Sequence, residues 1–269
     1  MDPDAGFGVV RGRWVGENDL VPDPYDLIPL KTAPDAPEGV VVRDEAEDAI
    51  EAAATDMFLH ATNCVRAFGD VHIALSGGRT PTRLYQQLML DPQYRSFPWK
   101  RTHLWSVNEP GRRCPSAASE VLVELIADHS DLPREQLHLI DTDSGPRAYA
   151  AKLREVLGWR EPGHDRLDYV LLGVGEDGST AGLAAGEAPP SEPLVHRAGP
   201  ADDEHVTLGL RLINASRFIA VLALGREKHE AVSRSVAGGS GSRPIDQVRP
   251  VGGVLRWYVD SPAITGATP

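Results

Sequence analysis

Cysteine is almost missing from this chain. The two cysteines, Cys64 and Cys114, lie fifty positions apart among 269 residues. No Cys-x-x-Cys pair and no cluster of cysteine with histidine occurs, so the sequence predicts neither a disulfide framework nor a zinc site, and we expect no metal. No run of about 18 apolar residues is present, which argues against a membrane-spanning helix. The first residues also lack the pattern of a secretory signal. These absences favour a cytoplasmic protein.

Lysine and aromatic residues are scarce as well. The 27 basic residues comprise 4 lysines and 23 arginines, and 39 acidic residues bring the net charge to −12. This acidic balance disfavours nucleic acid and anionic membranes as partners. Arginine can hold a phosphate group through two parallel hydrogen bonds, although genome composition alone also produces such a bias. Aromatics make up 6% of the chain, so the core must consist mainly of Leu, Val, Ala and Ile.

Proline and periodicity divide the chain into two parts. Residues 1–37 hold six prolines and no sustained hydrophobic period, which predicts an extended N-terminal arm with short strands at 8–15. Such an arm packs on the body of the protein or on a neighbouring subunit, so a homodimer through the arm is one expectation. Residues 38–269 are expected to form a single α/β domain.

Strand and helix patterns alternate through this domain. Buried strands are expected at 40–42, 71–75, 103–107, 137–140, 169–172, 206–210, 218–224 and 255–259. Helices are expected at 44–67, 81–89, 121–127, 147–157 and 227–236, with Thr80 as the cap of the second. Strands that alternate with helices of this length indicate a Rossmann-like, mostly parallel sheet with helices on both faces.

The end of the strand at 71–75 is a candidate anion site. It continues as Ser76-Gly77-Gly78-Arg79-Thr80, at the start of a predicted helix. Glycines at such a junction let backbone N–H groups point at a phosphate, and Arg79 or Arg83 adds positive charge. The alternative is a tight turn that needs glycine for its backbone angles and binds nothing.

Two further strand ends carry polar residues. Residues 173–180 read Gly-Val-Gly-Glu-Asp-Gly-Ser-Thr, and their G-x-G-x-x-G spacing suggests a dinucleotide site. We reject a dinucleotide site because this glycine motif lies late in the chain and no acidic residue ends a strand about twenty residues after it. The other strand end, residues 108–113, reads Asn-Glu-Pro-Gly-Arg-Arg and favours either a polar ligand or a solvated loop.

Together these segments resemble a known family. SGGRTP at 76–81, W-x-V-x-E at 105–109 and LLGVGEDGSTAGL at 171–183 follow the order found in the 6-phosphogluconolactonases. More broadly they are similar to the glucosamine-6-phosphate isomerase/deaminase superfamily. VTLGLRLINASRFIAVLALGREKHEAV and RPIDQVRPVGGVLRWYVDSPA resemble the C-terminal part of the family. The resemblance covers about residues 40–264 and implies a phosphogluconolactonase/deaminase-type fold.

The resemblance also implies a site. Its catalytic positions fall on Asp177, Ser179 and Glu109. Its positions for a sugar phosphate fall on Ser76, Gly77, Gly78, Arg79, Thr80, Lys228, His205 and Arg112. It implies a small sugar phosphate as the partner and no cofactor.

Three polar positions depart from the family pattern. Asn108-Glu109-Pro110 replaces an Asp-Glu-Arg triplet, His205 stands where an arginine is common, and Ser179 replaces the histidine that serves as general base. Serine has no pKa near neutrality with which to accept a proton.

Two hypotheses follow for the function. The chain hydrolyses 6-phosphogluconolactone to 6-phosphogluconate, a pentose phosphate reaction, or it is a non-catalytic relative that binds a sugar phosphate as a sensor or partner protein. Deaminase activity is a third and weaker hypothesis, because the deaminases also have a histidine at the position of Ser179. If the chain is active, another group must replace the base. The nearby candidates are Glu176, Asp177, His196 and His205.

Overall fold

The computed structural model describes residues 38–111, 117–158, 166–186, 193–200, 204–239 and 241–267. The N-terminal arm expected at 1–37, with its short strands, lies outside these residues. Among the helices that are described, none has both the length and the apolar character needed to cross a membrane.

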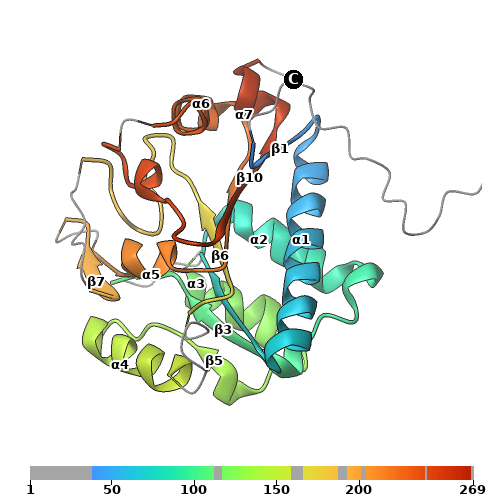
Figure 1. Cartoon of the computed structure of the whole chain (residues 1–269), viewed down its shortest axis with the longest axis vertical. Helices are drawn as coiled ribbons and strands as arrows, with labels where there is room; N and C mark the ends of the chain where they lie inside the picture. The colour runs from blue at the N-terminus through green and yellow to red at the C-terminus, as the bar shows by residue number, and fades with distance from the viewer. Residues whose placement is uncertain are drawn as a thin grey trace, which may run out of the picture. The chain divides into compact units, whose positions relative to one another are not determined.

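A seven-stranded sheet forms the centre of the domain (Figure 1). Its strand order is β1-β10-β9-β6-β2-β3-β5, and every pairing in it is parallel. The strands are β1 (Val40–Arg43), β2 (Val71–Leu75), β3 (Thr102–Ser106), β5 (Leu137–His138), β6 (Tyr169–Gly173), β9 (Phe218–Ala223) and β10 (Val254–Asp260). Because all are parallel, their carboxyl ends meet at one edge of the sheet, where ligands bind in folds of this class.

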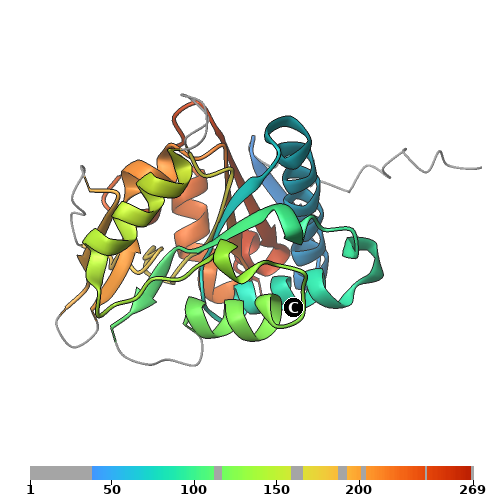
Figure 2. The same ribbon diagram turned by 90° about the horizontal axis from the view of Figure 1, so that it is seen from below.

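Helices cover both faces of this sheet. One face packs against α1 (Ala46–Phe68), α2 (Arg79–Leu90) and α3 (Ala118–Val121), which continues as the π-helical segment η4 (Leu122–Ala127). The other face packs against α4 (Gly145–Leu157), α5 (Leu210–Asn214), α6 (His229–Val236) and α7 (Ser261–Thr265). Figures 1 and 2 show α1 and α4 on opposite sides. Short 3₁₀ turns are η2 (Pro92–Tyr94), η3 (Trp99–Arg101), η5 (Arg134–Gln136), η6 (Arg226–Lys228) and η7 (Pro244–Gln247).

The apolar run of β6 explains why both faces are covered. Successive side chains of a strand point to opposite faces. Tyr169 and Leu171 accordingly join the core beneath α1 and α2, whereas Val170 and Leu172 join the core beneath α4. Strands buried on both faces read as continuous hydrophobic runs, which is why the sequence predicts this strand well.

A second, smaller sheet lies beside the carboxyl end of β3. It is antiparallel and has the order β4 (Asn108–Pro110), β8 (His205–Leu208) and β7 (Val195–Ala198). The backbone N–H of Leu208 donates to Val107 O (2.9 Å), which joins it to the chain that leaves β3. The sequence predicts neither β4 nor β7. It also extends β8 to residue 210, where the structure begins α5.

The start of α2 differs from the expected one in its cap. The residue at the cap is Gly78 rather than Thr80, with φ 106°, and no side chain caps the helix. Glycine adopts this positive φ without the steric cost that a side chain imposes. The helix therefore begins directly at the glycine pair that follows β2.

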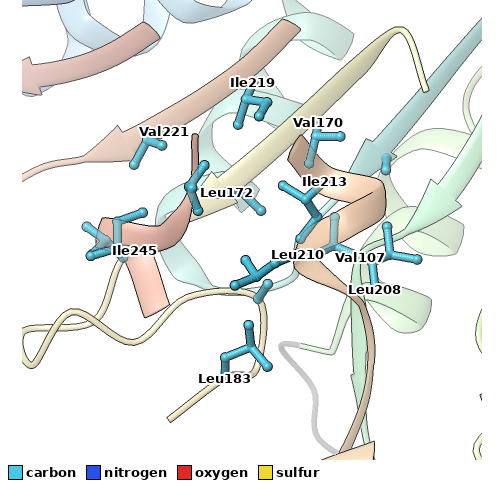
Figure 3. Packing of buried hydrophobic residues seen from close by; sticks show 14 of the residues in the cluster. Val107, Val170, Leu172, Leu183, Leu208, Leu210, Ile213, Ile219, Val221 and Ile245 are labelled. Carbon is cyan, nitrogen blue, oxygen red and sulfur yellow. The ribbon is translucent and has the colours of Figure 1, made fainter. Parts of the chain in front are cut away.

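The hydrophobic core continues under the loop that follows β6. Figure 3 shows Leu183 at the edge of the α4-side cluster, next to Leu210, with Leu172 and Ile245 nearby. Leu183 is buried, at 1% exposure. The loop after β6 is therefore anchored at its far end by core packing, which fixes the position of the polar residues before it.

Candidate functional site

Two adjoining pockets lie at the carboxyl edge of the large sheet and share Gly77 and Gly173. We call them the polar pocket and the helix-start pocket. The polar pocket measures about 440 Å³ and is lined by Ser76, Gly77, Asn108, Gly173, Gly175, Asp177, Ser179, Thr180, Ala181, Gly182, Leu183, Ala184, Gly199, Pro200 and His205. The helix-start pocket measures about 530 Å³ and is lined by Ala46, Gly77, Gly78, Arg79, Thr80, Pro81, Arg83, Gly173, Val174, Glu176, Leu222, Leu224, Gly225, Glu227, Lys228 and Asp260.

The loop after β2 forms the boundary between the two pockets. The Ser76 hydroxyl donates to Leu171 O (2.8 Å), and the Tyr85 hydroxyl donates to Ser76 O (2.6 Å). These buried bonds hold the loop rigidly against β6. Because no side chain caps α2 at Gly78, the first N–H groups of the helix are open to the helix-start pocket, where an anion is favoured.

Three cationic side chains border the same helix start. Arg79 is exposed, Lys228 is half-buried, and Arg83 is paired with Glu47 on α1. Lys228 ends the turn η6, which begins after Gly225 at φ 93°. The Asp260 carboxylate accepts the Gly225 N–H (3.0 Å) and thereby fixes this turn at the end of β10.

The loop after β6 closes on itself around Asp177 and Ser179. The Gly175 N–H donates to Ser179 O (2.7 Å), and the Ser179 N–H donates to Asp177 Oδ1 (2.9 Å). Hydrogen bonding from the Ser179 side chain, with a smaller contribution from the charge of Lys228, holds the pKa of Asp177 below its ordinary value. The loop thus presents an ionised carboxylate and a hydroxyl, with no proton acceptor of pKa near 7 at position 179.

The same loop is tied to β8. Ala181 has φ 53°, an uncommon conformation for a residue with a side chain. The buried hydroxyl of Thr207 donates to Ala181 O (2.5 Å) and holds it there. At the next residue, a Cβ added to Gly182 would lie 3.3 Å from Asn108 Nδ2 and 3.2 Å from His205 Cβ. The loop after β6 and the small sheet therefore form opposite walls of the polar pocket.

Side-chain alternation in the small sheet decides which residues face this pocket. Asn108 pairs with Thr207 and Pro110 pairs with His205, so these four lie on one face. Glu109 lies on the other face, where it accepts the backbone N–H of Ser119 (3.0 Å) and its side-chain hydroxyl. Burial raises the pKa of Glu109 despite these bonds.

A buried ion pair supports the loop from behind. Arg243 donates to both carboxylate oxygens of Asp246 (2.9 and 3.1 Å), and its aliphatic part lies against Gly178, where an added Cβ would come within 2.6 Å of Arg243 Cδ. The Ile245 N–H also donates to Gly178 O (3.2 Å). Sequence reasoning missed this support, and the only signal for it is the Arg-x-x-Asp spacing.

The structure brings most of the predicted site residues to the two pockets. Asp177, Ser179, Ser76, Gly77 and His205 line the polar pocket, and Gly77, Gly78, Arg79, Thr80 and Lys228 line the helix-start pocket. Glu109 lines neither, because strand alternation turns it toward Ser119, and Arg112 lies outside the described residues. Asn108, from the segment expected to bind a polar ligand, lines the polar pocket, and Glu176, a candidate base, lines the helix-start pocket, whereas Glu227 lines that pocket without having been proposed as a site residue.

A histidine ladder lies at the opposite end of β2, β3 and β5. His72 stacks on His103 (4.4 Å between ring centroids), and His103 Nδ1 lies 3.0 Å from His138 Nε2. Asp70, His72 and His103 also place metal-ligating atoms within 4.8 Å of one another. However, Trp105 Nε1–H donates to His72 Nδ1 (3.2 Å), which leaves the proton of a neutral His72 on Nε2, facing Asp70 at 3.5 Å. A metal bound at Nε2 would require the proton of the neutral ring to sit on Nδ1, where it would break the hydrogen bond from Trp105.

The sequence is similar to a known family and to several known proteins. The sequence profile of the family described as glucosamine-6-phosphate isomerases/6-phosphogluconolactonase matches residues 44–257. A GDH/6PGL endoplasmic bifunctional protein of Homo sapiens is 33% identical over 251 residues, 85% of this chain and 30% of that protein. A 6-phosphogluconolactonase of Haemophilus influenzae is 26% identical over 203 residues, 72% of this chain and 86% of that one.

The fold is shared with solved structures. The 6-phosphogluconolactonase of Thermotoga maritima has a TM-score of 0.70 and 20% identity, over 82% of this chain and 99% of that one. The chain therefore belongs to the glucosamine-6-phosphate isomerase/6-phosphogluconolactonase family, and the sequence-based expectation of this fold is confirmed. It spans about 30% of the length of the human bifunctional relative.

Proposed function

We propose that this chain is a 6-phosphogluconolactonase, which hydrolyses the ring ester of 6-phosphogluconolactone to 6-phosphogluconate. The single observation that carries the proposal is the junction of the two pockets at Gly77 and Gly173. An open helix start lies on one side of it and a polar pocket on the other. A phosphorylated sugar lactone has the matching pair of ends, one a dianion and the other a polar carbonyl.

The helix-start pocket would take the phosphate. The first turn of α2 has no side-chain cap and lines this pocket, and Lys228 adds a positive charge. Arg79 is available from the solvent side. The carboxylates of Glu176 and Glu227 line the same pocket and oppose an anion, so the phosphate is expected nearer to Gly78 and Lys228 than to these two carboxylates.

The polar pocket would take the lactone ring. A water molecule attacks the carbonyl carbon, the proton of that water goes to a base, and a tetrahedral oxyanion forms. The oxyanion then collapses, the bond from the carbonyl carbon to the ring oxygen breaks, and that oxygen receives a proton. The side-chain amide of Asn108 lines this pocket as a donor for the oxyanion or the sugar hydroxyls.

A second candidate function is binding without catalysis, and Ser179 is the observation that favours it. The loop offers no group that could accept a proton from the Ser179 hydroxyl at neutral pH. The neighbouring carboxylate of Asp177 is a weak proton acceptor because its pKa is lowered. A chain with this site would hold 6-phosphogluconate or its lactone and act as a sensor or partner protein.

One set of measurements separates the two functions. Lactone hydrolysis is followed with the spontaneous rate subtracted, and 6-phosphogluconate is titrated by calorimetry into the natural protein and into Gly78→Asp, whose carboxylate would repel a phosphate at the start of α2. Lactonase function predicts turnover above the spontaneous rate together with product binding that Gly78→Asp weakens. Binding without turnover supports the sensor, and no binding by the natural protein overturns both.

Location and assembly are further proposals. The two widely separated cysteines suit the reducing cytoplasm, whereas the human relative carries the word endoplasmic in its name. Cell fractionation distinguishes the two compartments. A homodimer through residues 1–37 predicts that the full chain and residues 38–269 differ in oligomeric state, which sedimentation equilibrium measures.

A further inference from the structure

We propose that His205 is the general base of this site, taking the proton of the attacking water in place of the residue at position 179. This inference rests on the lactonase function proposed above, because it assigns a residue to that reaction. The same imidazole, once protonated, returns the proton to the ring oxygen as the carbon–oxygen bond of the ester breaks. Water is consumed, the open-chain acid is formed, and the histidine ends neutral.

The position of His205 follows from β8 and its neighbours. His205 and Thr207 are two residues apart in a strand, so they lie on the same face, and Thr207 reaches Ala181 O on the loop after β6. A Cβ placed on Gly182 would lie 3.2 Å from Cβ and 3.3 Å from Cγ of His205. The base of the His205 side chain therefore lies beside Gly182, three residues after Ser179, and His205 and Ser179 line the same pocket.

Chemistry favours His205 over the other ionisable residue of this pocket. Asp177 and His205 are the titratable side chains among the described residues that line the polar pocket. A general base works best when its pKa lies near the working pH. The lowered pKa of Asp177 makes its carboxylate a weak proton acceptor at neutrality, whereas imidazole is the side chain that ordinarily titrates between about pH 6 and 7.

The remaining candidates are excluded by position. Glu109 faces Ser119 from the other side of β4, and Glu176 lines the helix-start pocket. His196 is buried on β7 and lines neither pocket. The charged groups around His205 are Asp177 across the pocket, Glu109 on the adjacent strand, and Glu204 beside it in sequence.

Two of these carboxylates are held by other residues. Glu204 is held in an ion pair by Arg197. Glu109 is buried on the far face of β4, where its pKa is raised, so its negative charge acts on His205 only from a distance. His205 thus shares the polar pocket with the Asp177 carboxylate and the side-chain amide of Asn108.

The test compares the natural protein with His205→Gln and with His205→Ala, the latter with and without added imidazole. His129→Gln is the matched control, because His129 is exposed and lines neither pocket. The rate of 6-phosphogluconolactone hydrolysis is measured from pH 5.5 to 8.5 with the spontaneous rate subtracted. Calorimetric binding of 6-phosphogluconate is measured on the same proteins and also reports whether each variant is folded.

A general base at position 205 predicts a specific pattern. In the natural protein kcat rises with pH over about 6 to 7. His205→Gln lowers kcat by about 10²–10⁴-fold and removes that rise, while product binding changes little. Added imidazole restores part of the rate of His205→Ala, and His129→Gln behaves as the natural protein.

Three results would overturn the assignment, and they are distinguishable. If His205→Gln keeps kcat and the pH dependence, the lactonase function stands and the base lies elsewhere. If His205→Gln weakens product binding in proportion to its loss of activity, His205 holds the phosphate, as the family resemblance implies. If the natural protein binds the product but never exceeds the spontaneous rate, the proposed hydrolysis fails and the base assignment fails with it.

Discussion

Alanine at Gly175 is predicted to disrupt the loop that carries Asp177 and Ser179, whereas alanine at Gly173 is predicted to be tolerated. A Cβ on Gly175 would lie 2.1 Å from Ser179 Oγ and 2.6 Å from Asp177 Oδ1, both closer than non-bonded atoms come. A Cβ on Gly173 meets nothing within 4 Å. Neither glycine has a positive φ, so backbone strain does not enter the comparison.

The size of the effect follows from which atoms must move. The carboxylate of Asp177 is exposed and can rotate away, but Ser179 is half-buried and its backbone closes the loop through Gly175. Forcing extra atoms into a packed site costs about 1–3 kcal/mol of unfolding free energy. Removing Oγ by Ser179→Ala takes away the closest contact of the new methyl group and leaves Ser179 Cβ 3.4 Å from it, so that the remaining close contact, at 2.6 Å, is with the rotatable carboxylate of Asp177.

Urea unfolding of four proteins measures this prediction: Gly175→Ala, Ser179→Ala, the double variant and Gly173→Ala. The loss of unfolding free energy in the double variant is expected to be smaller than the sum of the losses in the two single variants by about 0.5–3 kcal/mol, because the two changes share one contact. Additive free energies, or equal losses at positions 173 and 175, would refute the reasoning.

Three other predictions concern the support, the pH dependence and the chemistry of the domain. Asp246→Asn leaves the buried guanidinium of Arg243 without its counter-charge, and urea unfolding should show a loss of about 3 kcal/mol. Burial and neighbouring histidines lower the pKa of His138 to about 3, from an ordinary 6.5, so the unfolded chain binds a proton that the fold excludes. Stability should therefore fall as the pH drops from about 6.5 toward 3, by up to ~1.4 kcal/mol per pH unit, and His138→Asn should flatten the slope. Ser179→His should raise lactone hydrolysis by less than the ~10²–10⁴ of a well-placed base, most visibly in the His205→Gln background.

Each of these predictions has a result that contradicts it. An Asp246→Asn protein as stable as the natural one would mean that the ion pair is not what holds the loop. An unchanged pH slope in His138→Asn would place the excluded proton on another group. Ser179→Asn is the control for Ser179→His, and an equal gain from asparagine would exclude base catalysis by the new side chain.

The sequence predicts the large sheet because its strands are buried and bounded by clear signals. β2 agrees with the expected range 71–75, and β6 runs one residue beyond the expected 169–172. β6 is an apolar run that ends in glycine, and β2 is apolar except for His72 and is followed by Ser76 and two glycines. The small sheet escapes prediction because β4 is three residues long and includes Pro110, and its partner β8 lies about a hundred residues further on. A strand of that kind forms through tertiary contact rather than local preference.

The same limit decides how well the site is predicted. The glycine-containing loops after β2 and β6 are visible in sequence, and the structure places both at the pockets. The family resemblance implies a catalytic position at Glu109, but the direction of this side chain depends on the alternation of β4. Asn108 faces the polar pocket and Glu109 faces away from it because Asn108 pairs with Thr207 of β8. No local sequence pattern shows this pairing.

Strand order has a consequence for how this chain is made. Among the described strands, β1 lies at the edge of the sheet and pairs with β10 alone, so Val40 meets Trp257 only after more than two hundred intervening residues have been synthesised. Contacts between such distant segments slow folding, and a chain stopped before Val254 would leave β1 and β9 without their common neighbour. Asp260, at the end of β10, also fixes the Gly225 turn that positions Lys228. A ribosome-bound chain therefore has the glycine loops long before it has the turn that completes the proposed anion site, and premature termination near the C-terminus is expected to remove the proposed ligand binding and sheet closure together.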